Sequence, residues 1–321
     1  MHQRCWVHDY CAPSFYLITL ATEPRRSCLG RLQGEQIRLS PLGEMVRRSW
    51  FRSEEIYPGV EPDICAVMPD HFHGLLRVKE RLARPMGQVV RGFKASTTFL
   101  WRRDFGGARD APQLDEAGPV SAHPLRRSVP ATLWQKGFQD TILLRRGQLE
   151  RMRNYVLDNP RRLAMRRAHP ELFIQVAQLT HGCAGIGNRF LLERPVRRPV
   201  QVSRSVSPEA LAEKQAELLY AAAHGAVLVS PCISPGEKQI ARAALAADLP
   251  LIVLLENGFA PFYKPAGNYL EACAAGRLLM LAPWPHHDNK RAITREQCLA
   301  LNRLAKDICA GFFSRFQETG R

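Results

Sequence analysis

The sequence predicts an α+β two-layer sandwich with an antiparallel sheet, followed by a smaller α/β domain with a doubly wound parallel sheet. At 321 residues, the chain has a length that is typical of two domains rather than one. Closely paired strands alternate with single helices in the first half, whereas short apolar strands and helices alternate regularly in the last third. We expect the first domain at residues 10–165, a basic linker at 166–197 and the second domain at 198–315.

The first domain is expected to contain strands, a hairpin and three helices, which hydrophobic periodicity and turn residues delimit. The expected elements, in order, are a strand at 14–22, a hairpin at 28–39, a helix at 42–55, strands at 62–68 and 72–78, a helix at 86–103, a strand at 133–144 and a helix at 147–159. Pro160 is expected to end the last helix, because the residue before a proline avoids helical geometry. Residues 106–130 lack periodicity and are predicted to form a surface loop.

The positive charge is concentrated in the first half of the chain. Residues 1–200 contain 32 Lys and Arg against 19 Asp and Glu, and residues 201–321 contain 13 against 11. Most of the excess is arginine, whose planar guanidinium suits phosphate oxygens. Nucleic acid is therefore the expected partner of the first domain, although arginine-rich sequences also reflect genome composition.

Nothing in the sequence indicates export or a membrane. No run of about 18 apolar residues is present, and no basic segment precedes an apolar one at the N-terminus. The nine cysteines are odd in number and form no Cys-x-x-Cys pair, as is typical of reduced thiols. We expect a cytoplasmic protein.

His71 and His73 stand two apart on a predicted strand, so both side chains point to one face while Phe72 points to the other. A pair of imidazoles side by side suits a metal ion. The alternative is a His pair that only hydrogen-bonds to the neighbouring loop.

Tyr155 and Asn159 are four residues apart on a predicted helix and share a face. A tyrosine hydroxyl can displace an oxygen from a phosphodiester and store the bond energy as phosphotyrosine. A divalent ion held by His71, His73 and the Asn159 carbonyl would polarise the phosphate. The alternative for Tyr155 is a partly buried tyrosine with a packing role.

These residues lie in four stretches that, in order, resemble the REP-associated branch of the single-tyrosine HUH transposases: VMPDHFHG at 67–74, VRGFK at 90–94, LWQK at 133–136 and MRNYVLDNP at 152–160. The resemblance covers about residues 10–165 and implies an HUH transposase-like domain with His71 and His73 as the metal-binding motif. It implies Tyr155 as the nucleophile, Asn159 as the third metal-side residue, and Mg²⁺ or Mn²⁺ as the ion. Asp70 departs from the family, since many relatives have asparagine there.

The family acts on single-stranded DNA folded into hairpins, which is the substrate that the resemblance implies. Because this branch is found in bacteria, the resemblance also implies a bacterial protein associated with the nucleoid. Five basic residues are candidates for contacts with the DNA backbone: Arg91, Lys94, Arg145, Arg146 and Arg153. Whether the protein acts as a monomer or as a homodimer, and whether it is mobile or domesticated, stays open. A non-catalytic hairpin-binding protein is the main alternative function.

The loop at 230–237 of the second domain is a candidate phosphate or nucleotide site, because it follows a central strand and opens a helix. The candidate residues are Ser230, Ser234, Gly236 and Arg204. Ser234 and Glu237 also fit a capping box, which needs no ligand. Through the stretches at 225–230, 234–237 and 264–267, this domain resembles, more weakly, the Rossmann-like module of the DNA processing protein A and lysine-decarboxylase-like superfamily. Nucleotide binding or hydrolysis there is a further alternative.

Overall fold

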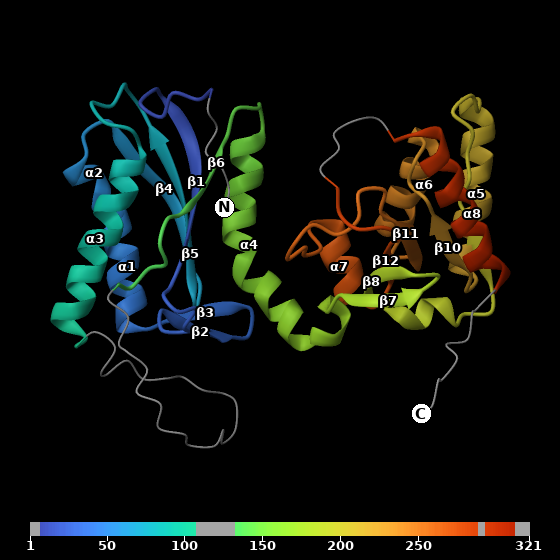
Figure 1. Ribbon diagram of the computed structural model, residues 1–321, viewed down its shortest axis with the longest axis horizontal. Helices are drawn as coiled ribbons and strands as arrows, with labels where there is room; N and C mark the ends of the chain where they lie inside the picture. The colour runs from blue at the N-terminus through green and yellow to red at the C-terminus, as the bar shows by residue number, and fades with distance from the viewer. Residues whose placement is uncertain (1–6, 107–131, 288–292, 312–321) are drawn as a thin grey trace, which may run out of the picture. The chain divides into compact units, whose positions relative to one another are not determined.

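The computed structural model describes residues 7–106, 132–287 and 293–311. It divides into two compact units, Met1–Ala164 and Met165–Arg321, each with its own sheet and core (Figure 1). Within the described residues, no helix combines the length and apolar composition that crossing a membrane requires.

The first unit is built on a four-stranded sheet with the order β4-β5-β1-β6. All of its pairings are antiparallel, which confirms the predicted antiparallel sheet. Its strands are β1 (Ser14–Ala21), β4 (Val60–Val67), β5 (His71–Val78) and β6 (Gln139–Ile142), with a separate hairpin of β2 (Gly30–Gln33) and β3 (Gln36–Leu39). Its helices are α1 (Pro41–Phe51), α2 (Ser53–Ile56), α3 (Gly87–Asp104) and α4 (Gln148–Ala168).

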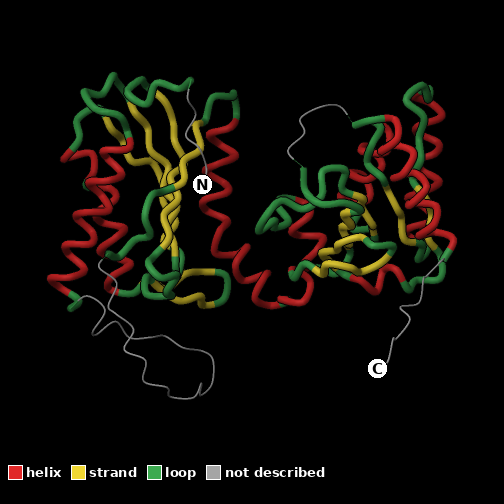
Figure 2. Tube along the Cα trace, in the orientation of Figure 1, coloured by secondary structure: helices red, strands yellow, loops and turns green. Residues whose placement is uncertain are grey.

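The sheet is covered on both faces, so this unit has three layers rather than the two that we predicted (Figures 1 and 2). On one face, α1 and α3 pack on Phe72 and Leu76 of β5. On the other face, Val156 of α4 packs on Leu75. Successive side chains of a strand point to opposite faces, and the central strands have apolar side chains on both faces. Each apolar face therefore needs a helix that covers it.

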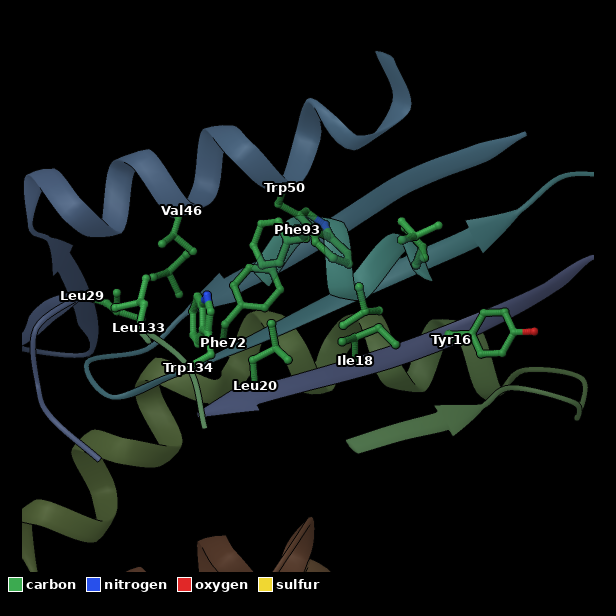
Figure 3. Close-up of a cluster of buried hydrophobic side chains, with 14 of the residues drawn as sticks. Tyr16, Ile18, Leu20, Leu29, Val46, Trp50, Phe72, Phe93, Leu133 and Trp134 are labelled. Atoms are coloured by element: carbon green, nitrogen blue, oxygen red, sulfur yellow. The ribbon is translucent and has the colours of Figure 1, made fainter. Parts of the chain in front are cut away.

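Four aromatic rings fill the core between the sheet and helices α1 and α3 (Figure 3). The Trp50 ring centroid lies 5.0 Å from that of Phe72 and 5.4 Å from that of Phe93. Trp134 packs on Phe93, and its indole Nε1 donates to Thr97 Oγ1 at 2.8 Å. Truncation of one such buried ring costs about 3–5 kcal/mol.

Two glycines allow large side chains to approach the backbone. A Cβ at Gly74 on β5 would meet the Trp50 ring at 2.5 Å, and a Cβ at Gly92 on α3 would overlap the Tyr57 hydroxyl. Both glycines lie within the motif stretches at 67–74 and 90–94. A side chain at Gly74 would displace the fully buried Trp50 ring, and one at Gly92 would displace the partly buried Tyr57 side chain.

Helix α4 continues to Ala168 through Pro160, so our prediction that Pro160 ends the helix is wrong. Proline removes one helical hydrogen bond and costs about 3 kcal/mol in a helix interior. Val156 and Asn159 before the proline are buried, and Leu163 after it packs on the same apolar cluster. Packing on both sides of Pro160 therefore outweighs its local preference.

Other predicted elements of the first unit differ in extent. The helix expected at 42–55 is divided into α1 and α2 at Arg52, and the strand expected at 133–144 pairs regularly only as β6, with one bridge between Thr22 and Trp134. The loop expected at 106–130 lies, apart from Gly106, outside the described residues.

The second unit is built on a six-stranded sheet with the order β7-β8-β12-β11-β10-β9. Its strands are β7 (Val176–Thr180), β8 (Cys183–Gly187), β9 (Arg197–Pro199), β10 (Val227–Ser230), β11 (Leu251–Leu254) and β12 (Leu278–Ala282). Its helices are α5 (Pro208–Ala223), α6 (Pro235–Ala246), α7 (Asn268–Ala274) and α8 (Arg295–Ala310), with 3-10 turns η1 (Pro170–Phe173) and η2 (Arg189–Leu192).

Strands β9 to β12 are parallel and adjacent in chain order. Helices α5, α6 and α7 pack on one face, and α8 with η2 packs on the other. We predicted a doubly wound sheet, in which the strand order reverses at a central point. Strands β9–β12 follow one another without such a reversal, so their order differs from the prediction. Residues 166–197, expected to form a linker, instead contribute β7 and β8 to this sheet as an antiparallel extension.

Candidate active site

The two histidines lie side by side on β5, as the spacing predicted. The ring centroids of His71 and His73 are 4.9 Å apart with an angle of 86° between the ring planes. Strand β5 begins directly after a tight turn, which the Met68 amide closes by donating to the His71 carbonyl at 2.8 Å. Because β5 pairs with β1 on one side and β4 on the other, the backbone beneath both rings is fixed.

Each imidazole is held at Nδ1 by a neighbour. His71 Nδ1 lies 2.6 Å from Asp70 Oδ1, and His73 Nδ1 lies 2.9 Å from the hydroxyl of Thr19, its partner across β1. Nε2 is therefore the nitrogen that each ring can offer to a metal. A carboxylate or hydroxyl behind an imidazole is the usual support of a metal-binding histidine, and it fixes the ring and its tautomer.

Asp70, which departs from the family pattern, belongs to this support. Its second oxygen lies 3.3 Å from Arg25 Nη1. Burial raises the pKa of Asp70, but the hydrogen bond with His71 and the charges of His71 and Arg25 outweigh it and lower the pKa overall. The carboxylate is therefore ionised at neutral pH, as a proton acceptor for His71 must be.

His73 is buried, with 7% of its surface exposed. Burial, followed by the charges of His71 and Arg25, lowers the pKa of His73 to about 3, against the opposing charge of Asp70. Its imidazole is therefore neutral at physiological pH, and the neutral form is the one that binds metal ions.

Helix α4 brings Tyr155 to the histidine pair. The ring centroids of Tyr155 and His73 are 5.7 Å apart, with an angle of 72° between the planes. The guanidinium carbon of Arg162 lies 5.1 Å from the centre of the same tyrosine ring. Asn159 is buried one turn beyond Tyr155, and its Nδ2 donates to the Tyr155 carbonyl at 2.8 Å. The amide oxygen of Asn159 is thus the atom that could coordinate an ion.

The donor set at this site fits a metal ion that accepts imidazole. Within the described residues, no group of three or more His, Cys, Asp and Glu side chains could hold a metal. An ion at His71 and His73 would therefore depend on two imidazoles, the Asn159 oxygen and water. Mg²⁺ prefers oxygen ligands, whereas first-row transition ions also accept imidazole. By this chemistry, Mn²⁺ fits better than Mg²⁺.

Two of the five predicted DNA-binding residues are engaged in contacts within the protein. Lys94 Nζ donates to the carbonyls of Gln135 and Gly137, both at 2.6 Å, and burial lowers its pKa. Arg153 forms ion pairs with Asp63 at 2.7 Å and with Glu150 at 3.7 Å. These two side chains are held in place by the fold.

The other three predicted DNA-binding residues are exposed. Arg91 lies on α3, which covers the face of the sheet opposite α4, whereas Arg145 and Arg146 directly precede α4. Arg145 and Arg146 are therefore better placed for DNA that reaches Tyr155.

Our sequence predictions did not include Arg162, Thr19 or Asp70 as active-site residues. Arg162 follows Tyr155 by two helical turns, a relation that is visible only when the helix is drawn through Pro160. Thr19 is distant in sequence from His73, and only the pairing of β1 with β5 reveals the contact.

In the second unit, side chains of the loop at 230–237 accept hydrogen bonds from backbone amides of the same loop. The buried carboxylate of Glu237 accepts from the amides of Ile233 and Ser234 at 2.8 and 3.0 Å, and from the Val202 amide at 3.2 Å. Ser234 Oγ accepts from the Glu237 amide at 3.2 Å, which completes a capping box. A phosphate at this helix terminus would compete with the Glu237 carboxylate for the same amides.

The other candidate residues for a phosphate site also have structural environments. Ser230 is buried and its hydroxyl accepts from the Cys232 amide at 3.2 Å. A Cβ at Gly236 would meet the Val202 side chain at 2.8 Å, so this glycine is required by packing. Arg204 is exposed.

We predict that Glu237→Ala destabilises the second unit by about 2–4 kcal/mol, because it removes the acceptor of three amides and one half of the capping box of α6. Urea denaturation followed by circular dichroism measures the loss. The control is Glu213→Ala on the exposed side of α5, which should change stability by less than about 0.5 kcal/mol. Equal effects of the two substitutions would contradict a capping role.

Comparisons with known proteins give distant likenesses. No protein-family model matches the chain. A protein of Haemophilus influenzae described as uncharacterized is 21% identical over 173 residues, which cover 48% of this chain and 83% of that protein.

Two solved structures are also similar to this chain. One is a REP-associated tyrosine transposase bound to a REP hairpin, with a TM-score of 0.33 and 16% identity, over 50% of this chain and 74% of that one. The other is a proposed transposase from Deinococcus radiodurans, with a TM-score of 0.29 and 15% identity, over 50% of this chain and 97% of that one. At these scores, neither likeness establishes the function of this chain.

Proposed function

We propose that the first unit is a metal-dependent DNA strand transferase, a transposase or a domesticated descendant of one. It would cut single-stranded or hairpin DNA through a 5′-phosphotyrosine at Tyr155 and rejoin it. The observation that carries the proposal is the approach of the Tyr155 ring to His73, from a helix far along the chain from the histidine motif. The resemblance of the four motif stretches supports the same assignment.

Each residue of the site has a role in this reaction. Tyr155 supplies the attacking hydroxyl, and transesterification conserves the energy of the phosphodiester for rejoining. Thr19 and Asp70 hold the imidazoles of His73 and His71 with Nε2 available for an ion. A bound Mn²⁺ or Mg²⁺ would supply Lewis-acid polarisation of the phosphate.

The charge of the first half of the chain and the exposed Arg145 and Arg146 beside α4 support nucleic acid as the substrate, and the hairpin form comes from the resemblance. Because these residues would contact the backbone, they would position DNA without selecting its sequence. For the second unit, whose parallel strands β9–β12 alternate with helices along the chain, we propose an accessory role.

The test is incubation of the full chain with 5′- and 3′-labelled hairpin DNA and Mn²⁺, followed by a denaturing gel. We expect a covalent protein–DNA adduct, a product with a free 3′-OH, and loss of both with a chelator. Hairpin binding without any cutting would instead support the non-catalytic binder. Cutting that persists with the chelator would remove the metal from the proposal.

A further inference from the structure

Arg162 occupies a special position beside the candidate nucleophile. It lies on α4 two turns after Tyr155, partly buried, with its guanidinium carbon 5.1 Å from the centre of the Tyr155 ring. The His73 ring approaches the same tyrosine. Tyr155 is therefore in contact with both an imidazole from β5 and a guanidinium from its own helix.

The charge of Arg162 is not neutralised within the part of the chain that the structure describes. Two other arginines of α4 have carboxylate partners: Arg153 pairs with Asp63 at 2.7 Å, and Arg161 pairs with Asp158 at 2.6 Å. For Arg162, the described contact is the aromatic face of Tyr155. A cation–π contact leaves the N–H groups of the guanidinium free to donate to another group.

An unpaired, partly buried guanidinium indicates an anion that arrives with the substrate. The planar fork of arginine donates two parallel hydrogen bonds to the oxygens of one phosphate. Attack by a tyrosine hydroxyl places negative charge on the nonbridging oxygens of that phosphate. A preorganised cation stabilises such charge more strongly than water does.

We propose that Arg162 is a catalytic residue of the strand-transfer site, which binds the nonbridging oxygens of the scissile phosphate above Tyr155. In the step that it promotes, the bond between Tyr155 Oη and phosphorus forms and the bond between phosphorus and the 3′ oxygen breaks. The phenol proton passes to solvent, and the 3′ oxygen takes a proton from solvent. This inference rests on the proposed function and adds the substrate contact of that site.

The test compares Arg162→Gln and Arg162→Lys in the full chain, with Arg151→Gln as the control that removes the same charge from an exposed position on α4. Loss of one preorganised donor lowers kcat by about 10²–10³-fold, and we expect this for Arg162→Gln in single-turnover adduct formation. Arg162→Lys should recover part of the rate, and Arg151→Gln should remain near wild type.

A phosphorothioate at the scissile position separates a phosphate contact from a structural role. Sulfur in place of a nonbridging oxygen should slow the wild type more than it slows Arg162→Gln, because the variant has already lost the contact. An equal sulfur effect in both proteins, or a wild-type rate in Arg162→Gln, would overturn the inference.

The same experiment distinguishes the failure of the two proposals. If the wild type forms no adduct at all with hairpin DNA and Mn²⁺, the proposed function fails, and Arg162 has no reaction to promote. If the wild type forms the adduct and Arg162→Gln forms it equally fast, the inference fails alone.

Discussion

Tyr155→Phe is expected to eliminate the covalent protein–DNA adduct and to retain hairpin affinity. The substitution removes the attacking oxygen and leaves the ring that contacts His73 and Arg162. Affinity should fall less than about tenfold, because loss of a hydrogen bond to the hydroxyl costs about 1 kcal/mol. A denaturing gel measures the adduct, and fluorescence anisotropy at fixed salt measures binding.

The matched control is Tyr57→Phe, which should form the adduct at the wild-type rate. Tyr57 packs on Gly92 of α3, on the face of the sheet opposite α4. Tyr16 is also a poor nucleophile, because it is fully buried and burial raises its pKa to about 12. An adduct that persists in Tyr155→Phe would transfer the nucleophile to another tyrosine and end the present assignment.

Removal of either imidazole is expected to abolish cutting through loss of the metal. For His73→Ala and His71→Ala, Mn²⁺ affinity should fall by more than about 100-fold, since even loss of a supporting group behind a metal ligand costs 10–100-fold. Isothermal titration calorimetry or the electron paramagnetic resonance of Mn²⁺ measures affinity independently of cutting. Excess Mn²⁺ should rescue part of the activity.

His73 is buried, so His73→Ala is first compared with wild type by circular dichroism to exclude unfolding. The side chain of His71 is 21% exposed, which makes His71→Ala the variant that tests metal binding without a large cavity. Thr19→Val retains His73 but removes its hydroxyl partner, and should fall between the wild type and His73→Ala. Unchanged Mn²⁺ affinity in His71→Ala and His73→Ala together would exclude a metal at this pair.

The strands of the first unit could be predicted because their signals are local. Alternation placed His71 and His73 on one face and Phe72 on the other, and the structure confirms this with Phe72 in the core beside Trp50. The contact of Tyr155 with His73 was implied by resemblance, since spacing alone could not join two distant elements.

Elements whose stability comes from distant partners could not be predicted in this way. Pro160 locally favours the end of a helix, but the burial of Val156 and the packing of Leu163 extend α4 through it. Residues 166–197 were predicted to form a linker because the segment is basic and irregular, whereas the pairing of β8 with β12 joins residues far apart in the chain. Arg162 was missed because the predicted helix ended at Pro160, before this residue.

The packing of Trp50 on Gly74 and of Tyr57 on Gly92 affects what sequence resemblance over the motif stretches can indicate. In a descendant that no longer moved DNA, a side chain at Gly74 would still displace the buried Trp50 ring and one at Gly92 the Tyr57 side chain, so selection for folding alone would favour keeping both glycines. Resemblance over those stretches therefore records common ancestry more faithfully than it records activity. Among descendants of such an enzyme, loss of activity would first be visible at groups that have no role in packing, above all at the hydroxyl of Tyr155.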